Sequence, residues 1–428
     1  MSVGPETLAR RLGFADAVVI GMGAMLGAGI FAVLGPASQA AGTGLLLALV
    51  LAAGVAYLNA TASAQLAAAH PTSGGTYVFG RECLGPWWGF AAGWSFVIGK
   101  TASCAAMALV FAAYAVPGPE WVQRLVAAGA VVALAALNYR GVTKTVALTK
   151  VLLALTLLAL VVVVVALATG EAGEAGSGTS LDGWDFLGEG GLLGTLQAAG
   201  LLFFAFAGYA RLATLGEEVV EPRRTIPRAI VTALTLTIGV YLVVAVAALL
   251  AAGPDRLAGS SAPLVAALDA VGQGSWAPVV GAGAAVAALG ALLSLMAGIG
   301  RTALAMGRGG DLPGWLAAVH PTHRSPHHAE VALAVVVAAL VLAVDLRDAI
   351  GFSSFGVLLY YAIANASAFT QPASERRWPR WSNVLGALSC VVLAATLPGS
   401  AVAAGAAVLA VGLLGRAVAL RGRARGVR

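Results

Sequence analysis

Long apolar stretches separated by short polar segments run through the whole chain of 428 residues. A helix needs about 20 apolar residues to cross the hydrocarbon core of a membrane. Charged residues make up only 10% of the chain, against about 25% in soluble domains. The sequence therefore predicts an all-α integral membrane protein with twelve transmembrane helices. The predicted spans cover residues 15–41, 44–69, 87–115, 122–138, 145–169, 191–215, 228–252, 276–306, 329–346, 348–370, 382–397 and 399–420.

The basic residues are distributed unevenly between the segments that link these spans. Arg and Lys accumulate on the cytoplasmic side of membrane proteins, and only Arg124, Arg256 and Arg347 fall on the sparse side. We therefore expect a multi-pass protein of the cell (inner) membrane with both termini in the cytoplasm. The basic side holds Arg10, Arg11, Arg81, Arg140, Lys144, Lys150, Arg223, Arg224, Arg228, Arg301, Arg308, Arg324, Arg376, Arg377, Arg380, Arg416, Arg421, Arg423, Arg425 and Arg428.

Few residues outside the spans suggest a catalytic or metal-binding site. Residues 170–183 read as a solvated outer loop that is too short and polar to bury a core. Cys83, Cys104 and Cys390 lack metal-ligand spacing, so we expect them to be packing residues. Four histidines, His320, His323, His327 and His328, share one loop without helical pairing, and an interfacial loop is favoured over a metal site. No cofactor or metal is expected, and nucleic acid is not a predicted partner.

Two glycine-rich segments, residues 21–31 and 203–214, interrupt spans in corresponding places of the two halves of the chain. In lipid such a break is tolerated only where the freed backbone groups face protein, a ligand or water. A matched pair of broken spans is typical of the substrate site of a secondary transporter. The sequence therefore favours substrate transport as the function.

The two halves also predict the domain organisation. Each half, about residues 15–169 and 191–370, contains five spans and opens with a broken one. Five is an odd number, so the halves would insert with opposite orientation, as an inverted repeat requires. We expect residues 1–370 to form the transporter core, and residues 371–428 to add two peripheral helices and a basic tail.

The first break admits two interpretations. Free N–H groups at the start of the second half-helix would suit a carboxylate, assisted by the helix dipole. Alternatively, glycines at four-residue spacing, such as Gly23 and Gly27, let membrane helices pack closely. The matching second break favours the ligand interpretation. In that second break, Phe204 or Phe206 could cover a bound substrate, or simply pack in the core.

Charged side chains at membrane depth are candidates for coupling or gating. Lys100 lies about 20 Å into its span at 1.5 Å per residue. It could act as a proton relay, replace a cotransported cation, or form a structural ion pair. Arg211 follows the second break, and its predicted partners are Glu218, seven residues later on the same helix face, or Glu217. A structural pairing and a direct ligand or gating role stay open for Arg211.

Several motifs together resemble the amino acid permeases of the amino acid–polyamine–organocation superfamily. Residues 70–77, HPTSGGTY, followed by Leu84-Gly85-Pro86 and the pattern Gly89-Phe90-x-x-Gly93-Trp94, are similar to the signature after that family's second helix. Gly27-Ala28-Gly29-Ile30-Phe31 resembles its unwound first helix. The segment 203–218, with Pro222 and Pro227, is similar to its broken sixth helix, and residues 301–313 to the end of its eighth. The matches span residues 14 to about 370.

The resemblance implies a LeuT-like fold with a five-plus-five inverted repeat, discontinuous first and sixth helices, and alternating access around an amino acid. The substrate carboxylate would meet backbone amides at Gly27, Ala28, Gly29 and Ile30. Its ammonium would meet carbonyls near Phe204, Ala205, Phe206 and Ala207, beside Gly208, with Phe204 as an aromatic gate. Proton or sodium coupling, the direction of transport and the oligomeric state stay open.

This chain departs from the family pattern at two positions. Relatives that carry cationic substrates have an acid two residues after the glycine of the sixth helix, where this chain has Ala210. A neutral or acidic amino acid is therefore favoured over a dibasic one. Proton-coupled relatives carry a lysine deep in the fifth helix, where this chain has Thr156, while Lys150 comes too early. Lys100 could take over that role.

Other functional classes fit less well. A carrier for a polyamine or another organic cation remains an alternative within the same fold. A major facilitator fold would need a basic Asp-Arg motif after the second span, which Gly80-Arg81-Glu82 does not match. A channel would need a continuous polar pore, but only Lys100 and Arg211 lie at depth. No catalytic constellation falls on the spans, so an enzyme is not expected.

Overall fold

The computed structural model describes residues 12–70, 74–116, 118–140, 146–170, 187–215, 218–323 and 325–426. Throughout these residues the chain is helical, and its only extended pairing is a single parallel bridge between Leu12 and Val219. The predicted all-α class is confirmed for this part of the chain. The helices of the first half are α1 (Phe14–Met25), α2 (Gly29–Ala32), α3 (Leu34–Ala41), α4 (Leu45–Ala69), α5 (Gly75–Cys83), α6 (Pro86–Ala115), α7 (Glu120–Tyr139) and α8 (Val146–Thr169).

The remaining helices follow in the second half and the C-terminal part. They are α9 (Gly191–Phe206), α10 (Ala210–Ala213), α11 (Pro222–Ala258), α12 (Pro263–Ala270), α13 (Ala277–Arg308), α14 (His327–Ala343), α15 (Leu346–Phe369), α16 (Arg380–Thr396) and α17 (Gly399–Gly426). A 3₁₀ turn, η2 (Ala207–Tyr209), joins α9 to α10. In the described residues, ten segments are long and apolar enough to cross a membrane.

Two of the twelve predicted spans form shorter helices. α14 and α16 have 17 residues each. At 1.5 Å per residue that is about 26 Å, somewhat less than the roughly 30 Å of bilayer hydrocarbon. The other predicted spans lie on longer helical segments, several of which extend beyond the apolar stretch. α11, for example, begins six residues before the predicted span because Pro222 opens it directly after Glu221, whose φ is +47°.

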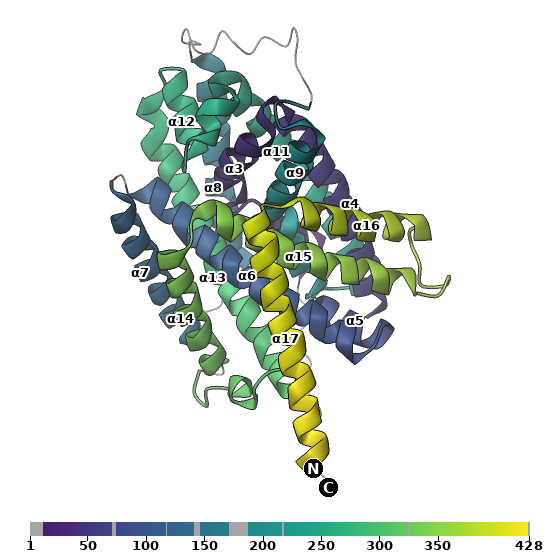
Figure 1. Ribbon diagram of the computed structural model, residues 1–428. Helices are drawn as coiled ribbons and strands as arrows, with labels where there is room; N and C mark the ends of the chain where they lie inside the picture. Colours follow the sequence, from purple (N-terminus) through teal and green to yellow (C-terminus); the bar gives the residue numbers. More distant parts are fainter. Residues whose placement is uncertain are drawn as a thin grey trace.

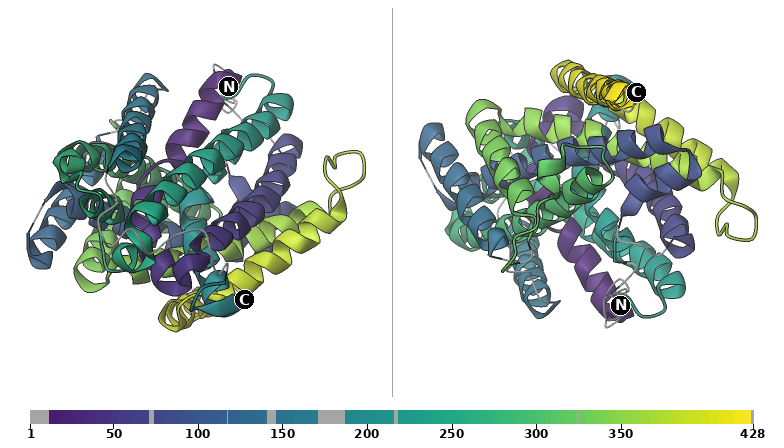
Figure 2. Two further views of the ribbon diagram at one scale, coloured as in Figure 1. Left: turned by 90° about the horizontal axis from the view of Figure 1, so that it is seen from above. Right: turned by 90° about the horizontal axis from the view of Figure 1, so that it is seen from below.

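The helices form a bundle with α6 near its centre, where it packs against both α15 and α13 (Figure 1). α4 packs against α11 and α9, and α1 against α11 and α8. α7 and α14 lie side by side on one flank (Figure 1). Views from above and below show α17 at the edge of the bundle (Figure 2). This arrangement surrounds the two interrupted segments with other helices.

The C-terminal helix α17 is fastened to the core by the carboxylate of Asp311, which lies in the turn after α13. Arg416 of α17 forms a 2.9 Å ion pair with Asp311, and Arg81 of α5 approaches the other carboxylate oxygen at 3.1 Å. The Arg416 guanidinium also lies over the rings of Trp87 and Phe90, 5.0 and 4.8 Å from their centroids. Segments that the charge distribution put on one side of the membrane therefore meet around one acid.

Tyr77 of α5 completes this cluster. Its hydroxyl donates a 2.9 Å hydrogen bond to Asp311. Burial, together with the neighbouring carboxylate, raises the pKa of Tyr77 above its usual value. The phenol therefore stays protonated and remains a donor at neutral pH.

We predict that Asp311→Asn lowers the free energy of unfolding by about 3 kcal/mol, because it leaves the buried Arg416 guanidinium without a counter-charge. The Asp311 and Arg416 side chains are only 5% and 6% exposed. The matched control is Glu120→Gln, which breaks an exposed pair with Arg124 and should cost about 0.5 kcal/mol or less. Denaturant titration in detergent micelles measures both. Equal losses in the two variants would contradict the prediction.

Candidate substrate site at two helix breaks

The first break is narrower than the sequence predicts. α1 ends at Met25, the chain bends over residues 26–28, and α2 begins at Gly29. Gly21 and Gly23 remain helical and serve close packing: a Cβ added at Gly21 would come within 2.6 Å of Leu212, and one at Gly23 within 3.1 Å of Thr149. The close-packing interpretation describes both of these glycines and also Gly27, where an added Cβ would come within 2.6 Å of Ala291 on α13. The interruption itself belongs to the segment Leu26-Gly27-Ala28.

Consecutive backbone N–H groups around this bend, from Gly27 to Phe31, have no backbone acceptor among the described residues. All five residues are buried. An unpaired buried N–H costs free energy comparable to a lost hydrogen bond. The segment that is predicted to bind a carboxylate therefore contains backbone N–H donors without a backbone acceptor. Binding of a carboxylate there stays a prediction.

The second break is a tightening of the helix rather than an open bend. α9 ends at Phe206, and the 3₁₀ turn η2 leads into α10. Side chains from other helices donate hydrogen bonds to the backbone carbonyls of this segment. Tyr241 of α11 lies 3.1 Å from the Ala205 oxygen. The carbonyl oxygen of Ala207 accepts from Lys100 of α6 at 3.2 Å and from Tyr361 of α15 at 3.5 Å.

The two breaks are in direct contact. A Cβ added at Gly29 would lie 2.7 Å from the Cα atom of Ala205, and one at Gly208 would overlap the backbone of Ala24. The Tyr241 hydroxyl also lies 2.6 Å from the carbonyl oxygen of Met25, so it joins both segments. The structure brings together the two predicted halves of the site and holds them closed. An occupant would have to move the segments apart.

The aromatic residues of the second break point to different neighbours. Phe203 meets the ring of Tyr361 edge-on at 5.7 Å, and Phe206 packs against Tyr241 at 5.1 Å. Phe204 is 7% exposed and belongs to the apolar core. For Phe206 the core-packing interpretation therefore describes the closed structure. The gating role of Phe204 stays a prediction.

Comparison of the sequence with known proteins identifies the family of this chain. A sequence profile described as amino acid permease matches residues 12–412. The chain belongs to the amino acid permease family. It is 56% identical to a transporter of Mycobacterium tuberculosis over 410 residues, which cover 96% of this chain and 91% of that protein.

More distant relatives carry substrate names. The branched-chain amino acid permease BcaP of Bacillus subtilis is 26% identical over 398 residues, covering 88% of this permease and 84% of the relative. The chloroplastic cationic amino acid transporter 7 of Arabidopsis thaliana is 28% identical over 407 residues, covering 89% and 69%. These names describe the relatives, and they differ in the charge of the substrate. The family makes this chain a transporter rather than an enzyme.

Arg211 and Glu218 interact electrostatically, but they do not share a helix face. α10 ends at Ala213 and the chain turns before α11, so Glu218 does not lie on the same helix as Arg211. The prediction of a shared helix face is therefore wrong, because Glu218 lies in the turn, and its backbone pairs with Leu12 instead. No described carboxylate lies within 4.0 Å of the Arg211 guanidinium. Glu217 lies outside the described residues.

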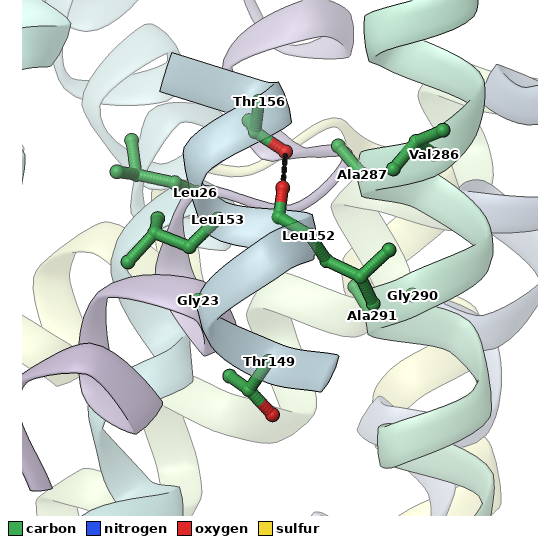
Figure 3. A pocket seen from close by; sticks show the side chains of 10 residues that line it. All are labelled: Gly23, Leu26, Thr149, Leu152, Leu153, Thr156, Val286, Ala287, Gly290 and Ala291. Carbon is green, nitrogen blue, oxygen red and sulfur yellow. Dashed lines mark hydrogen bonds between the residues drawn. The ribbon is translucent and has the colours of Figure 1, made fainter. Parts of the chain in front are cut away.

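A small pocket opens beside the first break of the permease, between α1, α8 and α13 (Figure 3). Thr156 faces it and donates a 2.8 Å hydrogen bond to the carbonyl of Leu152. Lys150 lies outside this pocket and forms a 2.8 Å ion pair with Asp16 at the start of α1. The lining residues are Gly23, Leu26, Thr149, Leu152, Leu153, Thr156, Val286, Ala287, Gly290 and Ala291.

The sequence reasoning missed the buried tyrosines that hold the breaks. Tyr241 and Tyr361 are 0% exposed, and both bond carbonyls at the second break. Tyr114 of α6 donates a 2.8 Å hydrogen bond to the carbonyl of Phe31 in α2. A signal was present, because a tyrosine within an apolar span needs a partner for its hydroxyl. Which carbonyl receives the bond depends on helix packing, which spacing along the chain does not reveal.

We predict that Tyr241→Phe destabilises the permease by about 1–2 kcal/mol, because the buried carbonyls of Met25 and Ala205 lose the single hydroxyl proton that they share. The control is Tyr57→Phe on α4, where the side chain is 43% exposed. Denaturant titration in micelles gives the free energy of unfolding for both variants. A Tyr241→Phe protein as stable as the control would show that the bridge between the breaks contributes nothing.

Proposed function

We propose that this permease is a secondary active transporter that moves amino acids across the cytoplasmic membrane by alternating access. The supporting observation is that Gly29, in the segment with unpaired N–H groups, packs directly against Ala205, whose carbonyl and that of Ala207 are acceptors at the second break. An α-amino acid carries one carboxylate and one ammonium on adjacent atoms. Donors on one segment and acceptors on the other therefore match both of its charged groups.

The binding step follows from this complementarity. The substrate carboxylate accepts from the N–H groups of Gly27, Ala28, Gly29 and Ile30, which lack acceptors in the closed structure. The substrate ammonium donates to carbonyls of the segment Phe204 to Gly208, in place of the Tyr241 hydroxyl. Both exchanges satisfy buried polar groups in a low-dielectric interior, where each hydrogen bond is electrostatically stronger than in water.

Transport requires the contact between the breaks to open toward one side of the membrane at a time. We propose twelve crossings, in which α14 and α16 cross as short helices, and an inverted repeat of about residues 15–169 and 191–370. Rocking of one set of helices against the other then exposes a fixed site alternately. Residues 371–428 add two helices outside this repeat, and both termini lie in the cytoplasm.

Gating and coupling residues lie on both sides of the breaks. Lys100 bonds a carbonyl at the second break, while Arg211, Glu217 and Glu218 mark the cytoplasmic exit of the same segment in the proposed orientation. The ion pair between Asp16 and Lys150 ties the start of α1 to α8 and has to break if α1 swings outward. Either protons or sodium could drive the cycle.

An organic-cation carrier in the same fold is the second candidate, and a relative named as a cationic amino acid transporter favours it. A channel is a third, from another functional class. A counterflow experiment distinguishes the channel from the two kinds of carrier. Liposomes loaded with unlabelled amino acid should accumulate labelled amino acid transiently against its gradient if the protein is a carrier, and a channel produces no such overshoot.

We predict that Gly29→Leu abolishes substrate binding and counterflow, because the new side chain fills the space between Gly29 and Ala205. The matched control is Gly54→Leu on α4, where an added Cβ meets nothing within 4 Å. Both variants are first tested for folding by thermal unfolding in detergent, and binding is then measured by titration with amino acids. Normal affinity in folded Gly29→Leu protein would refute the proposed site.

A further inference from the structure

Lys100 places a positive charge directly at the second break. Its ammonium donates to the Ala207 carbonyl at 3.2 Å, and the residue is only 6% exposed. An ammonium has three N–H donors, and this is its one hydrogen bond to any residue that the structure describes. The helix α6 thus places a buried cation beside the backbone of the candidate site, and this cation has N–H groups that can donate further hydrogen bonds.

The charge belongs to the same small volume as the proposed acceptors for the substrate. Ala207 is two residues from Ala205, whose backbone touches Gly29, and it precedes Gly208, whose backbone touches Ala24. Tyr361 approaches the same Ala207 oxygen at 3.5 Å. A substrate held between the two breaks would therefore lie beside the Lys100 ammonium rather than a helix away from it.

No described acidic side chain forms an ion pair with this cation, although the buried Glu330 of the neighbouring helix α14 acts electrostatically on Cys104 of α6. The segments that surround the breaks contain neither Asp nor Glu over residues 17–32, 45–69, 86–115, 191–213, 277–308 and 349–369. In the described parts of the chain, no carboxylate lies within 4.0 Å of the Lys100 ammonium. Cys104, one helical turn along α6, presents only a buried thiol. Arg211 adds a second basic residue just beyond the break.

We propose that Lys100 determines the charge specificity of the transporter: the site takes amino acids with uncharged or acidic side chains and excludes those with cationic side chains. This inference rests on the proposed function and refines its substrate class. A zwitterion adds no net charge beside Lys100, and an acidic side chain compensates the ammonium. A dibasic amino acid or a polyamine brings a further cation to a buried site where no described carboxylate pairs with Lys100, and there like charges repel strongly.

The experiment uses counterflow competition in liposomes with pairs of amino acids that match in size and differ in charge. Citrulline is compared with arginine, and homoserine with 2,4-diaminobutyrate, with putrescine as a polyamine probe. In each pair whose neutral member is carried by the wild type, the cationic member should compete at least about tenfold more weakly. A wild-type protein that accepts arginine as readily as citrulline, or diaminobutyrate as readily as homoserine, overturns the inference.

Variants then test whether Lys100 is the cause. Lys100→Met and Lys100→Gln should lower the neutral-to-cationic ratio at least about fivefold, while Arg256→Gln, which removes an exposed basic residue, should leave the ratio unchanged. An unchanged ratio in folded Lys100 variants overturns the inference, and so does loss of transport of every amino acid by folded variants. If the wild type carries no amino acid at all, the proposed function fails, and the inference falls with it.

Discussion

The structure depends on satisfying main-chain polar groups where two helices lose their hydrogen bonds inside an apolar bundle. Water is absent from the hydrocarbon core of a membrane, so each freed N–H or C=O needs a partner within the protein or from a ligand. In the closed structure the carbonyls have partners: Tyr241 joins Met25 to Ala205, and Lys100 and Tyr361 share Ala207. The N–H groups of residues 27–31 have none among the described residues. This asymmetry is the basis of the proposal that the first break receives the substrate carboxylate.

Several helices contribute side chains that bond the two breaks. α6 contributes Lys100 to the second break and Tyr114 to the first, and it also packs against α13 and α15. α11 contributes Tyr241. A movement that parts the two breaks therefore changes the hydrogen bonds of α6, α11 and α15 together. Small residues at the contact, Gly29 against Ala205, make the closed arrangement compact.

A second centre of charge fastens the C-terminal helix. Asp311 receives Arg416 from α17, and Arg81 and Tyr77 from α5. The Trp94 indole also donates a 2.9 Å hydrogen bond to the carbonyl of Val408 on α17. α17 lies at the edge of the bundle but is bonded to the end of α13 and to α6. Helices outside the proposed repeat thus have a defined mechanical connection to helices that surround the site.

The sequence by itself indicated the helical class and an interruption in each of two corresponding segments, because apolar length and clustered glycine report on membrane crossing and helix stability. It predicted twelve spans, whereas ten segments of the described residues are long and apolar enough to cross a membrane. Only the tertiary structure decided that Gly21, Gly23 and Gly27 all pack closely against neighbouring helices, that Glu218 lies in a turn and not on the helix of Arg211, and that Lys100 meets Ala207. The residues concerned are distant in sequence, 107 positions apart for Lys100 and Ala207. Local periodicity specifies which face of a helix is apolar, but the neighbour that fills that face is chosen by packing in three dimensions.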